Sequence, residues 1–388
     1  MKALSGSHLK AACLRAFGQT PSERWLFGVT LALVFVVLPL TLSGFRLSLV
    51  GKYLTYAFPA VGLVLCWGKG GILSLGQGVF FGLGGYCMAM FLKLEASDAE
   101  STSIQSTPGI PDFMDWNQLT ELPWFWVPFQ SLPLALLAVF VVPGLLAYAL
   151  SAAMFKRRVG GVYFAIITQA LASIVTILII GQQGYTGGVN GITDLKTLAG
   201  WDIRTDEAKL ILYYVNACLL FATILLCRSM FYSKLGRVLV ATRDREERVR
   251  FTGYSVSSMK TFAFVSAAVI SAVGGAMFTL LVGFMSPSFV GIVPSIEMVI
   301  AAAIGGRHSL LGAVYGSLIV NYGRTYFSEE FPELWLFFLG GLFIAVVLLF
   351  PNGLAAIQLQ RVVGSARETS SKLAKGAGRA PTPGSEVP

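Results

Sequence analysis

The chain has 388 residues, of which 55% are hydrophobic and only 13% are charged. Soluble domains carry about a quarter of their residues as charged side chains, so this composition excludes an ordinary soluble enzyme. The missing charge leaves apolar stretches of about 20 residues, the length that a helix needs to cross a bilayer. These stretches are continuous rather than alternating, which predicts helices and not barrel strands. The sequence therefore predicts an all-α polytopic membrane protein.

Apolar segments between clusters of charge predict about ten transmembrane helices, some of them short or interrupted. In chain order the segments are 26–43, 51–68, 72–92, 131–152, 160–180, 209–227, 260–282, 294–305, 309–325 and 335–350. The first is too long for a signal-peptide core and is not followed by a small-residue cleavage site, so it is interpreted as an uncleaved span. The eighth is too short for a full crossing at about 1.5 Å per residue. It is either a half-helix or extends back through Pro287 and Pro294.

Basic residues predict the orientation, because cytoplasmic loops of membrane proteins are enriched in Lys and Arg. With both termini in the cytoplasm, 22 of the 29 Lys and Arg residues fall on the cytoplasmic side. Acidic residues gather on the opposite side, chiefly in the outer loop 93–130. The net charge of +9 follows from this bias. Basic residues beside the membrane suit anionic lipid headgroups, so the charge implies no nucleic-acid partner.

The predicted organisation has three parts. A cytoplasmic tail at 1–25 precedes a transmembrane domain at 26–357, and a cytoplasmic tail follows at 358–388. The last tail is rich in Ser, Gly, Ala, Pro and Lys, a composition typical of disorder. The transmembrane domain also contains a cytoplasmic loop at 228–260, which carries a dense group of charges.

Glycines concentrate within the predicted spans, most densely at 70–85. Small residues at three- and four-residue spacing allow helix backbones to pack closely in lipid. Alternatively, the glycines mark an interrupted helix whose free backbone groups line a polar pathway together with Gln77. A second glycine-rich run at 305–312 hints at an internal repeat, and a third at 185–192 suits either an outer cap or a loop at the mouth of a pathway.

Polar residues within the spans are candidate pathway residues. Glu297 is the only acidic residue that the prediction places in a span, where a carboxylate must be paired, protonated or in contact with water. It is either a gating residue or a helix-start residue stabilised at the outer interface by the helix dipole. The neutral candidates within spans, which either join helices or contact a substrate, are Gln77, Gln169 and Asn216, and Asn190 in the glycine-rich run outside the fifth span is a further pathway candidate. The spans are expected to contain no paired charges, which argues against an ion-coupled carrier.

Motifs for chemistry are absent from the sequence. It contains no GxxxxGKS/T phosphate loop, no HExxH metal motif and no supported Ser/His/Asp arrangement. The five cysteines show no CxxC spacing, so no disulfide and no metal site are predicted. We therefore expect a translocation protein without catalytic residues, and not an enzyme. If transport is active, its energy comes from another chain.

The loop at 228–260 contains a segment, 236–254, in which apolar and charged residues alternate at helical spacing. Gly253 is placed to end this helix. An amphipathic helix of this kind either lies on the membrane surface or docks into a groove on a cytoplasmic partner.

Several runs occur in an order that is typical of one family. They are the glycine-rich segment 70–85, the run Arg158-Val159-Gly160-Gly161-Val162-Tyr163-Phe164-Ala165-Ile166, the run Thr186-Gly187-Gly188-Val189-Asn190-Gly191, the pair Arg243-Asp244, the pair Gly305-Gly306, and Pro351-Asn352-Gly353-Leu354. Together they resemble the permease subunits of branched-chain amino acid ABC importers, from about residue 50 to 357. Two further runs, 249–254 and 331–340, are closer to the urea-transporting branch of that family, and the chain resembles its second, longer permease subunit.

The resemblance implies an ATP-driven importer in the bacterial inner membrane that moves urea into the cytoplasm. The implied partners are a second permease, two ATPase subunits that bind the ATP, and a periplasmic binding protein, while this chain binds no cofactor. It also implies that the segment 236–254 contains the helix that couples to the ATPases. The coupling positions would be Ala241, Thr242, Arg243, Asp244, Arg245, Glu246 and Glu247. The long outer loop 93–130 departs from the family pattern and is either an elaboration or a contact for the binding protein.

The substrate has more than one interpretation. Urea is small and neutral, so its pathway needs neutral polar groups, which agrees with the scarcity of charge in the spans. A branched-chain amino acid is a zwitterion whose charges would need to be balanced. The alternatives are a permease for branched-chain amino acids or short amides, a stand-alone channel or secondary carrier, and a membrane-embedded enzyme.

Overall fold

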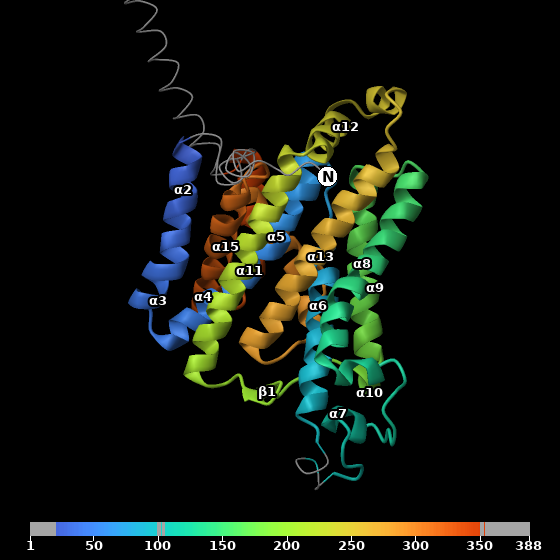
Figure 1. Cartoon of the computed structure of the whole chain (residues 1–388), viewed down its shortest axis with the longest axis vertical. Coiled ribbons are helices and arrows are strands. Elements are labelled where there is room, and N and C mark those ends of the chain that lie inside the picture. The colour runs from blue at the N-terminus through green and yellow to red at the C-terminus, as the bar shows by residue number, and fades with distance from the viewer. Residues whose placement is uncertain (1–20, 99–101, 103–104, 350–352, 354–388) are drawn as a thin grey trace, which may run out of the picture.

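The computed structural model describes residues 21–98, 102, 105–349 and 353, which form a bundle of long helices (Figure 1). Within these residues, eight helical segments are long and apolar enough to cross a membrane, which confirms the prediction of an all-α polytopic membrane protein. The segments are Glu23–Thr41, Gly44–Lys69, Gln77–Glu95, Leu132–Lys156, Val162–Gly181, Asp206–Tyr232, Val256–Val282 and Pro287–Gly305. The last two predicted spans correspond to α15 (Leu310–Glu330) and α16 (Trp335–Leu349). Residues 1–20 and 354–388, and with them the prediction that both termini are cytoplasmic, lie outside the described residues.

The first two spans are composite helices. The first comprises α2 (Pro21–Ala32), the π-helix η1 (Leu33–Val37) and α3 (Leu38–Thr41). The second comprises α4 (Gly44–Thr55), α5 (Ala57–Leu63) and the π-helix η2 (Val64–Lys69). The second span therefore begins at Gly44 and not at residue 51. The prediction was wrong there because Arg46 resembles a loop residue, whereas it belongs to α4.

The third span begins later than predicted, since residues 70–76 are not helical and α6 (Gln77–Glu95) starts at Gln77. The outer loop that follows contains α7 (Asp112–Asp115) and the 3-10 helix η3 (Val127–Gln130). Next come α8 (Leu132–Lys156), α9 (Val162–Gly181) and the short α10 (Gln183–Thr186). A small antiparallel hairpin pairs β1 (Thr197–Leu198) with β2 (Trp201–Asp202).

The remaining helices are α11 (Asp206–Tyr232), α12 (Lys234–Phe251), α13 (Val256–Val282), the 3-10 helix η4 (Pro287–Phe289) and α14 (Ile292–Gly305). The uncertain eighth span extends back through Pro294, which lies inside α14, and Pro287, which opens η4. Both prolines lie in the first turn of their helices, where the missing N–H removes no helical hydrogen bond. The half-helix alternative is therefore unnecessary.

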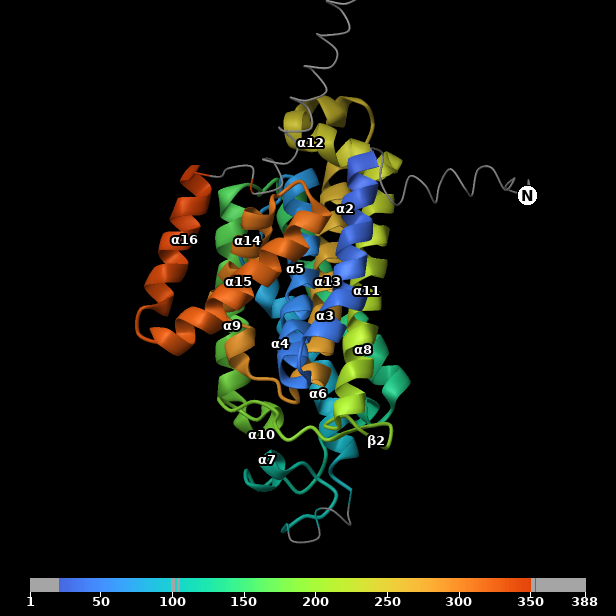
Figure 2. The ribbon, with the colours of Figure 1, turned by 90° about the vertical axis from the view of Figure 1, so that its left-hand side faces the viewer.

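The two predicted loops lie at opposite ends of the bundle. Helix α12 projects beyond the end of the bundle at which α2 begins and α16 ends, whereas α7, α10 and the hairpin lie at the other end (Figures 1 and 2). This separation agrees with the orientation predicted from the charges. We refer to the α12 end as the cytoplasmic end and to the α7 end as the outer end.

The centre of the bundle is held by close contacts between glycines and backbone. A Cβ on Gly275 of α13 would lie 1.8 Å from the carbonyl oxygen of Phe81, and one on Gly84 of α6 would lie 2.2 Å from that of Ala272. The same relationship joins α14 to α15, where a Cβ on Gly305 would lie 2.0 Å from the carbonyl oxygen of Gly312. Such contacts replace the hydrophobic drive that is missing between helices in lipid. The packing interpretation therefore holds for the glycines within α6, and the interruption lies just before it.

Candidate functional site

The start of α6 lies inside the bundle, at the end of the non-helical segment 70–76. Gly71 has a φ of +68°, a conformation that favours glycine, and it allows the chain to turn back into the bundle after η2. Backbone N–H groups around the start of α6 donate hydrogen bonds to hydroxyl groups from two other helices. Leu75 N–H donates to Thr168 Oγ1 of α9 at 3.0 Å, and Gly78 N–H donates to Ser295 Oγ of α14 at 3.0 Å. Three elements therefore meet at the break through neutral polar groups.

Gln77, the first residue of α6, is fully buried at this break. Its Oε1 accepts a hydrogen bond from Ser271 Oγ of α13 at 2.9 Å, whereas its Nε2 has no hydrogen-bond partner. A buried donor without a partner costs about 1–3 kcal/mol. Such a cost within a packed core is consistent with a functional group, because Nε2 can donate to the carbonyl oxygen of a small solute.

The other neutral candidates lie in different environments. Asn216 of α11 is fully buried and donates from Nδ2 to the carbonyl oxygen of Gly51 at 3.0 Å, so it joins α11 to α4. Gln169 is half-buried on α9, next to Thr168 at the break. Asn190 is exposed in a turn at the outer end. The structure therefore places Gln77 alone of these candidates at the break, with Gln169 one residue after Thr168 on α9.

Glu297 forms an ion pair inside the bundle. Its Oε2 lies 2.7 Å from Nη1 of Arg324 on α15, and the Glu297 side chain is 3% exposed against 36% for Arg324. The expectation that the spans contain no paired charges is therefore wrong. Arg324 lies at the very end of the predicted span 309–325, but α15 continues to Glu330 and holds Arg324 within the helix, beside Glu297 of α14. Glu297 lies a turn inside α14, which begins at Ile292, so the helix-start interpretation does not hold either.

Helix α12 presents the predicted coupling residues on two faces. Ala241, Asp244, Arg245 and Glu247 are exposed at the cytoplasmic end. Thr242 is buried, and Glu246 bonds to Lys260 of α13 and to Arg250, at 2.6 Å in each case. Gly253 follows the helix with a φ of +82°, which confirms the predicted end.

Arg243 links α12 to the membrane helices. Its Nη1 donates to the carbonyl oxygen of Gly68 in η2 at 2.7 Å, while its Nε bonds to Asp244 at 3.0 Å. Among the predicted coupling residues, those on the exposed face are available to a partner protein and the others hold α12 to its own bundle.

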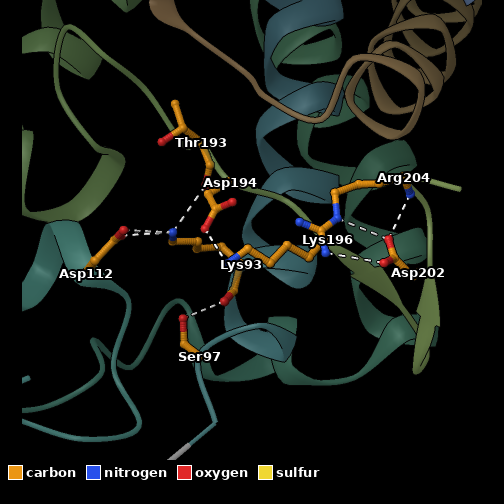
Figure 3. A network of polar contacts seen from close by, with 8 residues as sticks. All are labelled: Lys93, Ser97, Asp112, Thr193, Asp194, Lys196, Asp202 and Arg204. Carbon is orange, nitrogen blue, oxygen red and sulfur yellow. Dashed lines mark hydrogen bonds and ion pairs between the residues drawn. The ribbon is translucent and has the colours of Figure 1, made fainter. Parts of the chain in front are cut away.

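The outer loop 93–130 folds against the segment that carries the hairpin (Figure 3). Lys93, which is buried, pairs with Asp112 of α7 at 3.0 Å and donates to the carbonyl oxygen of Thr193 at 3.2 Å. Glu95 accepts a hydrogen bond from Ala199 N–H at 2.9 Å. The loop is thus fixed to the rest of the outer end by a buried cation, and Asp202 and Arg204 add an exposed ion pair beside it at 3.2 Å.

Several polar groups at the break were not predicted from the sequence: Thr168, Ser271 and Ser295. Serine and threonine within apolar helices commonly bond to their own backbone, as Ser271 also does to Ala267 at 2.9 Å. Their second role depends on which helix lies opposite, and no spacing in the sequence carries that information.

Comparison with known proteins gives the family. Residues 45–347 match the family described as branched-chain amino acid transport system, permease component. The chain belongs to this family. The match covers α4 through most of α16 and includes every candidate pathway and coupling residue.

Named permease proteins are similar along most of the chain. The high-affinity branched-chain amino acid transport system permease protein LivM is 25% identical over 359 residues in both Salmonella typhimurium and Escherichia coli, covering 87% of this chain and 76% of LivM. The corresponding protein BraD of Pseudomonas aeruginosa is 20% identical over 318 residues, covering 77% of this chain and 91% of BraD. No solved structure matches the chain. The protein is thus a multi-pass membrane permease, and its relatives are transport-system subunits.

Proposed function

We propose that this permease is the translocation subunit of an ATP-driven importer in a bacterial inner membrane. The family membership and the transport systems named for its relatives support the importer class. The exposed face of α12 supports a contact with cytoplasmic ATPase subunits. Two such subunits would bind the ATP, a second permease would complete the pathway, and a periplasmic binding protein would deliver the substrate. This chain itself would bind no cofactor.

We propose urea as the first substrate, and the observation that carries this choice is the amide of Gln77. Its Nε2 is buried and without a partner, and it complements the carbonyl oxygen of urea. The groups around the break are neutral hydroxyls, which can accept hydrogen bonds from the N–H groups of the solute. Glu297 and Arg324 neutralise each other's charge in an ion pair, so this pair adds no net charge at the break.

The proposed mechanism couples the two ends of the bundle. Closure of the ATPases would displace α12, and the displacement would open the break before α6 toward the cytoplasm. A solute would exchange hydrogen bonds with water for hydrogen bonds with Gln77 and its hydroxyl neighbours. Because the site has no net charge, a neutral solute can leave it without breaking a strong ion pair.

Branched-chain amino acids are the second candidate substrate, and the printed names of the relatives favour them. Short amides fit the same neutral groups as urea. A stand-alone channel or a secondary carrier remains an alternative of another class. The ion pair of Glu297 and Arg324 gives that alternative a charged group within the membrane, but each charge already has its counter-ion.

Uptake of labelled urea and labelled leucine tests these alternatives in cells from which the gene is deleted and then restored. We expect deletion to abolish urea uptake at micromolar concentration, and the restored gene to recover it. Loss of leucine uptake alone would keep the importer and replace the substrate. Uptake that persists when ATP is depleted but the membrane potential is maintained would instead indicate a channel or a carrier.

A further inference from the structure

The link from α12 to η2 lies immediately before the break in the third span. Arg243 reaches the carbonyl oxygen of Gly68, one residue before the end of η2 at Lys69. The carbonyl groups in the last turn of a helix lack helical partners, and a cation there is favoured by the helix dipole. The guanidinium of Arg243 therefore satisfies the cytoplasmic end of η2.

The residues around the hydrogen bond between Arg243 and Gly68 are closely packed. A Cβ on Gly71 would lie 2.8 Å from Cγ of Arg243, so the aliphatic part of the Arg243 side chain packs directly against the first residues of the non-helical segment 70–76. A Cβ on Gly68 would lie 1.8 Å from the carbonyl oxygen of Arg307, in the connection between α14 and α15. Lys69 lies over the ring of Phe231 at 5.0 Å. A displacement of Arg243 must therefore move the end of η2 or break the hydrogen bond.

Helix α12 has a second attachment beyond a kink. Arg245 has non-helical angles, with φ −151° and ψ 81°, and divides α12 into two parts. The part before the kink holds η2 through Arg243, and the part after it holds α13 through Glu246 and Lys260 at 2.6 Å. Bending at Arg245 therefore changes the position of η2 relative to α13.

These two attachments lead to the same pair of residues inside the bundle. The segment that follows η2 ends at Gln77, and α13 carries Ser271, which bonds to Gln77 at 2.9 Å. We propose that Arg243 is a positioning residue that transmits movement of α12 to the break before α6 and so controls the contact between Gln77 and Ser271. The inference rests on the proposed function, because it assumes that ATPase subunits move α12.

The test compares Arg243→Met with Arg248→Met in the purified complex that contains the full chain, reconstituted in vesicles. Methionine retains an aliphatic stem against Gly71 but cannot donate to Gly68. Arg248 is exposed on the same helix, so its variant removes the same charge without removing this link. We expect Arg243→Met to assemble and hydrolyse ATP, while urea uptake per ATP falls about tenfold, as expected for the loss of a hydrogen bond to a charged group. Arg248→Met should remain coupled.

A second readout follows the break directly. The five native cysteines are replaced by alanine, and a thiol is introduced by Ser74→Cys in the buried part of the segment 70–76. We expect ATP to change the rate at which a water-soluble maleimide labels this thiol when Arg243 is present. The ATP-dependent change should disappear with Arg243→Met, although ATP hydrolysis continues.

The outcomes separate this inference from the proposed function. A wild-type complex that moves neither urea nor leucine contradicts the proposed function. Wild-type uptake together with normal coupling in Arg243→Met overturns this inference alone. Failure of Arg243→Met to assemble would also overturn it, because Arg243 would then have a purely structural role.

Discussion

Two polar sites lie buried in the helix bundle, and they differ in what they leave unsatisfied. Between α14 and α15, Glu297 and Arg324 bring opposite charges to 2.7 Å. Between α6 and α13, Gln77 and Ser271 are neutral, and the Nε2 of Gln77 has no hydrogen-bond partner. The charged site is compensated within the chain, whereas the neutral site retains a donor.

This difference indicates that the charged site serves mainly the stability of the fold and the neutral site mainly transport. A buried charge that loses its partner is far more costly than a buried amide, so the charged pair constrains the fold strongly. An amide donor without a partner constrains the fold little and can bind a solute that supplies an acceptor. The comparison therefore predicts that changes at the charged site unfold the protein and that changes at the neutral site stop transport.

The largest expected effect is the loss of Arg324. Arg324→Met removes the guanidinium that lies 2.7 Å from the carboxylate of Glu297, which is 3% exposed. Removing one partner of a buried pair costs about 3–5 kcal/mol, so the melting temperature of the purified protein should fall sharply. The double variant Glu297→Gln and Arg324→Met removes both charges and should recover much of the loss. A single variant as stable as the wild type would contradict the view that this pair is structural.

The next largest effect is expected at the close contact between α6 and α13, the two helices that carry Gln77 and Ser271. Gly275→Ala places a Cβ 1.8 Å from the carbonyl oxygen of Phe81 and must separate α13 from α6. Overpacking of this kind costs about 1–3 kcal/mol, which thermal unfolding would measure. Gly340→Ala on α16 is the matched control, since a Cβ there meets nothing within 4 Å. Equal melting temperatures for the two variants would show that the close contact is not needed.

A smaller effect, on transport rather than on folding, is expected at Gln77. Gln77→Leu removes the donor without a partner and the acceptor of Ser271, so the stability should change by less than about 1 kcal/mol. Urea uptake should fall about tenfold or more, because the solute loses a hydrogen bond within the membrane. Asn216→Leu is a control of the opposite kind, since Asn216 joins α11 to α4. Undiminished uptake in Gln77→Leu would remove Gln77 from the pathway.

Much of the fold can be predicted from the sequence because every segment that crosses lipid must satisfy its own backbone hydrogen bonds and therefore forms an apolar helix. Continuous apolar runs predicted the helices, and Gly253 predicted the end of α12. The errors occurred near the ends of spans: Arg46 lies inside α4, before the predicted start at residue 51, and α15 continues past the predicted end at residue 325. A basic residue near a span end has the same appearance in the sequence whether it faces water or a carboxylate on another helix.

The site was predicted only in part for a related reason. Gln77 and the glycines before it are visible in the sequence, since a polar residue after such a run is unusual in a span. The hydroxyl groups of Thr168 and Ser295 come from helices far away in the chain. The inward role of Arg243 is likewise set by the position of Gly68. These contacts depend on how the helices pack, which periodicity does not encode.

The smallest expected effect comes from an ionic contact at the cytoplasmic end of the bundle, in which half-buried Glu246 bonds to Lys260 and Arg250. Partial burial acts to raise the pKa of Glu246, but the hydrogen bonds and charges of Lys260 and Arg250 outweigh it and hold the pKa below its ordinary value. Because the folded pKa is the lower one, the contact stabilises α12 above the ordinary Glu pKa of about 4.3 and is lost as the pH falls through the lowered value. Hydrogen exchange of the amides at 246–251 should therefore gain protection when the pH rises out of that acidic range, after correction for the intrinsic rate. Glu246→Gln should abolish this gain, and an identical pH profile in the variant would show that the contact with Lys260 does not hold the second part of α12.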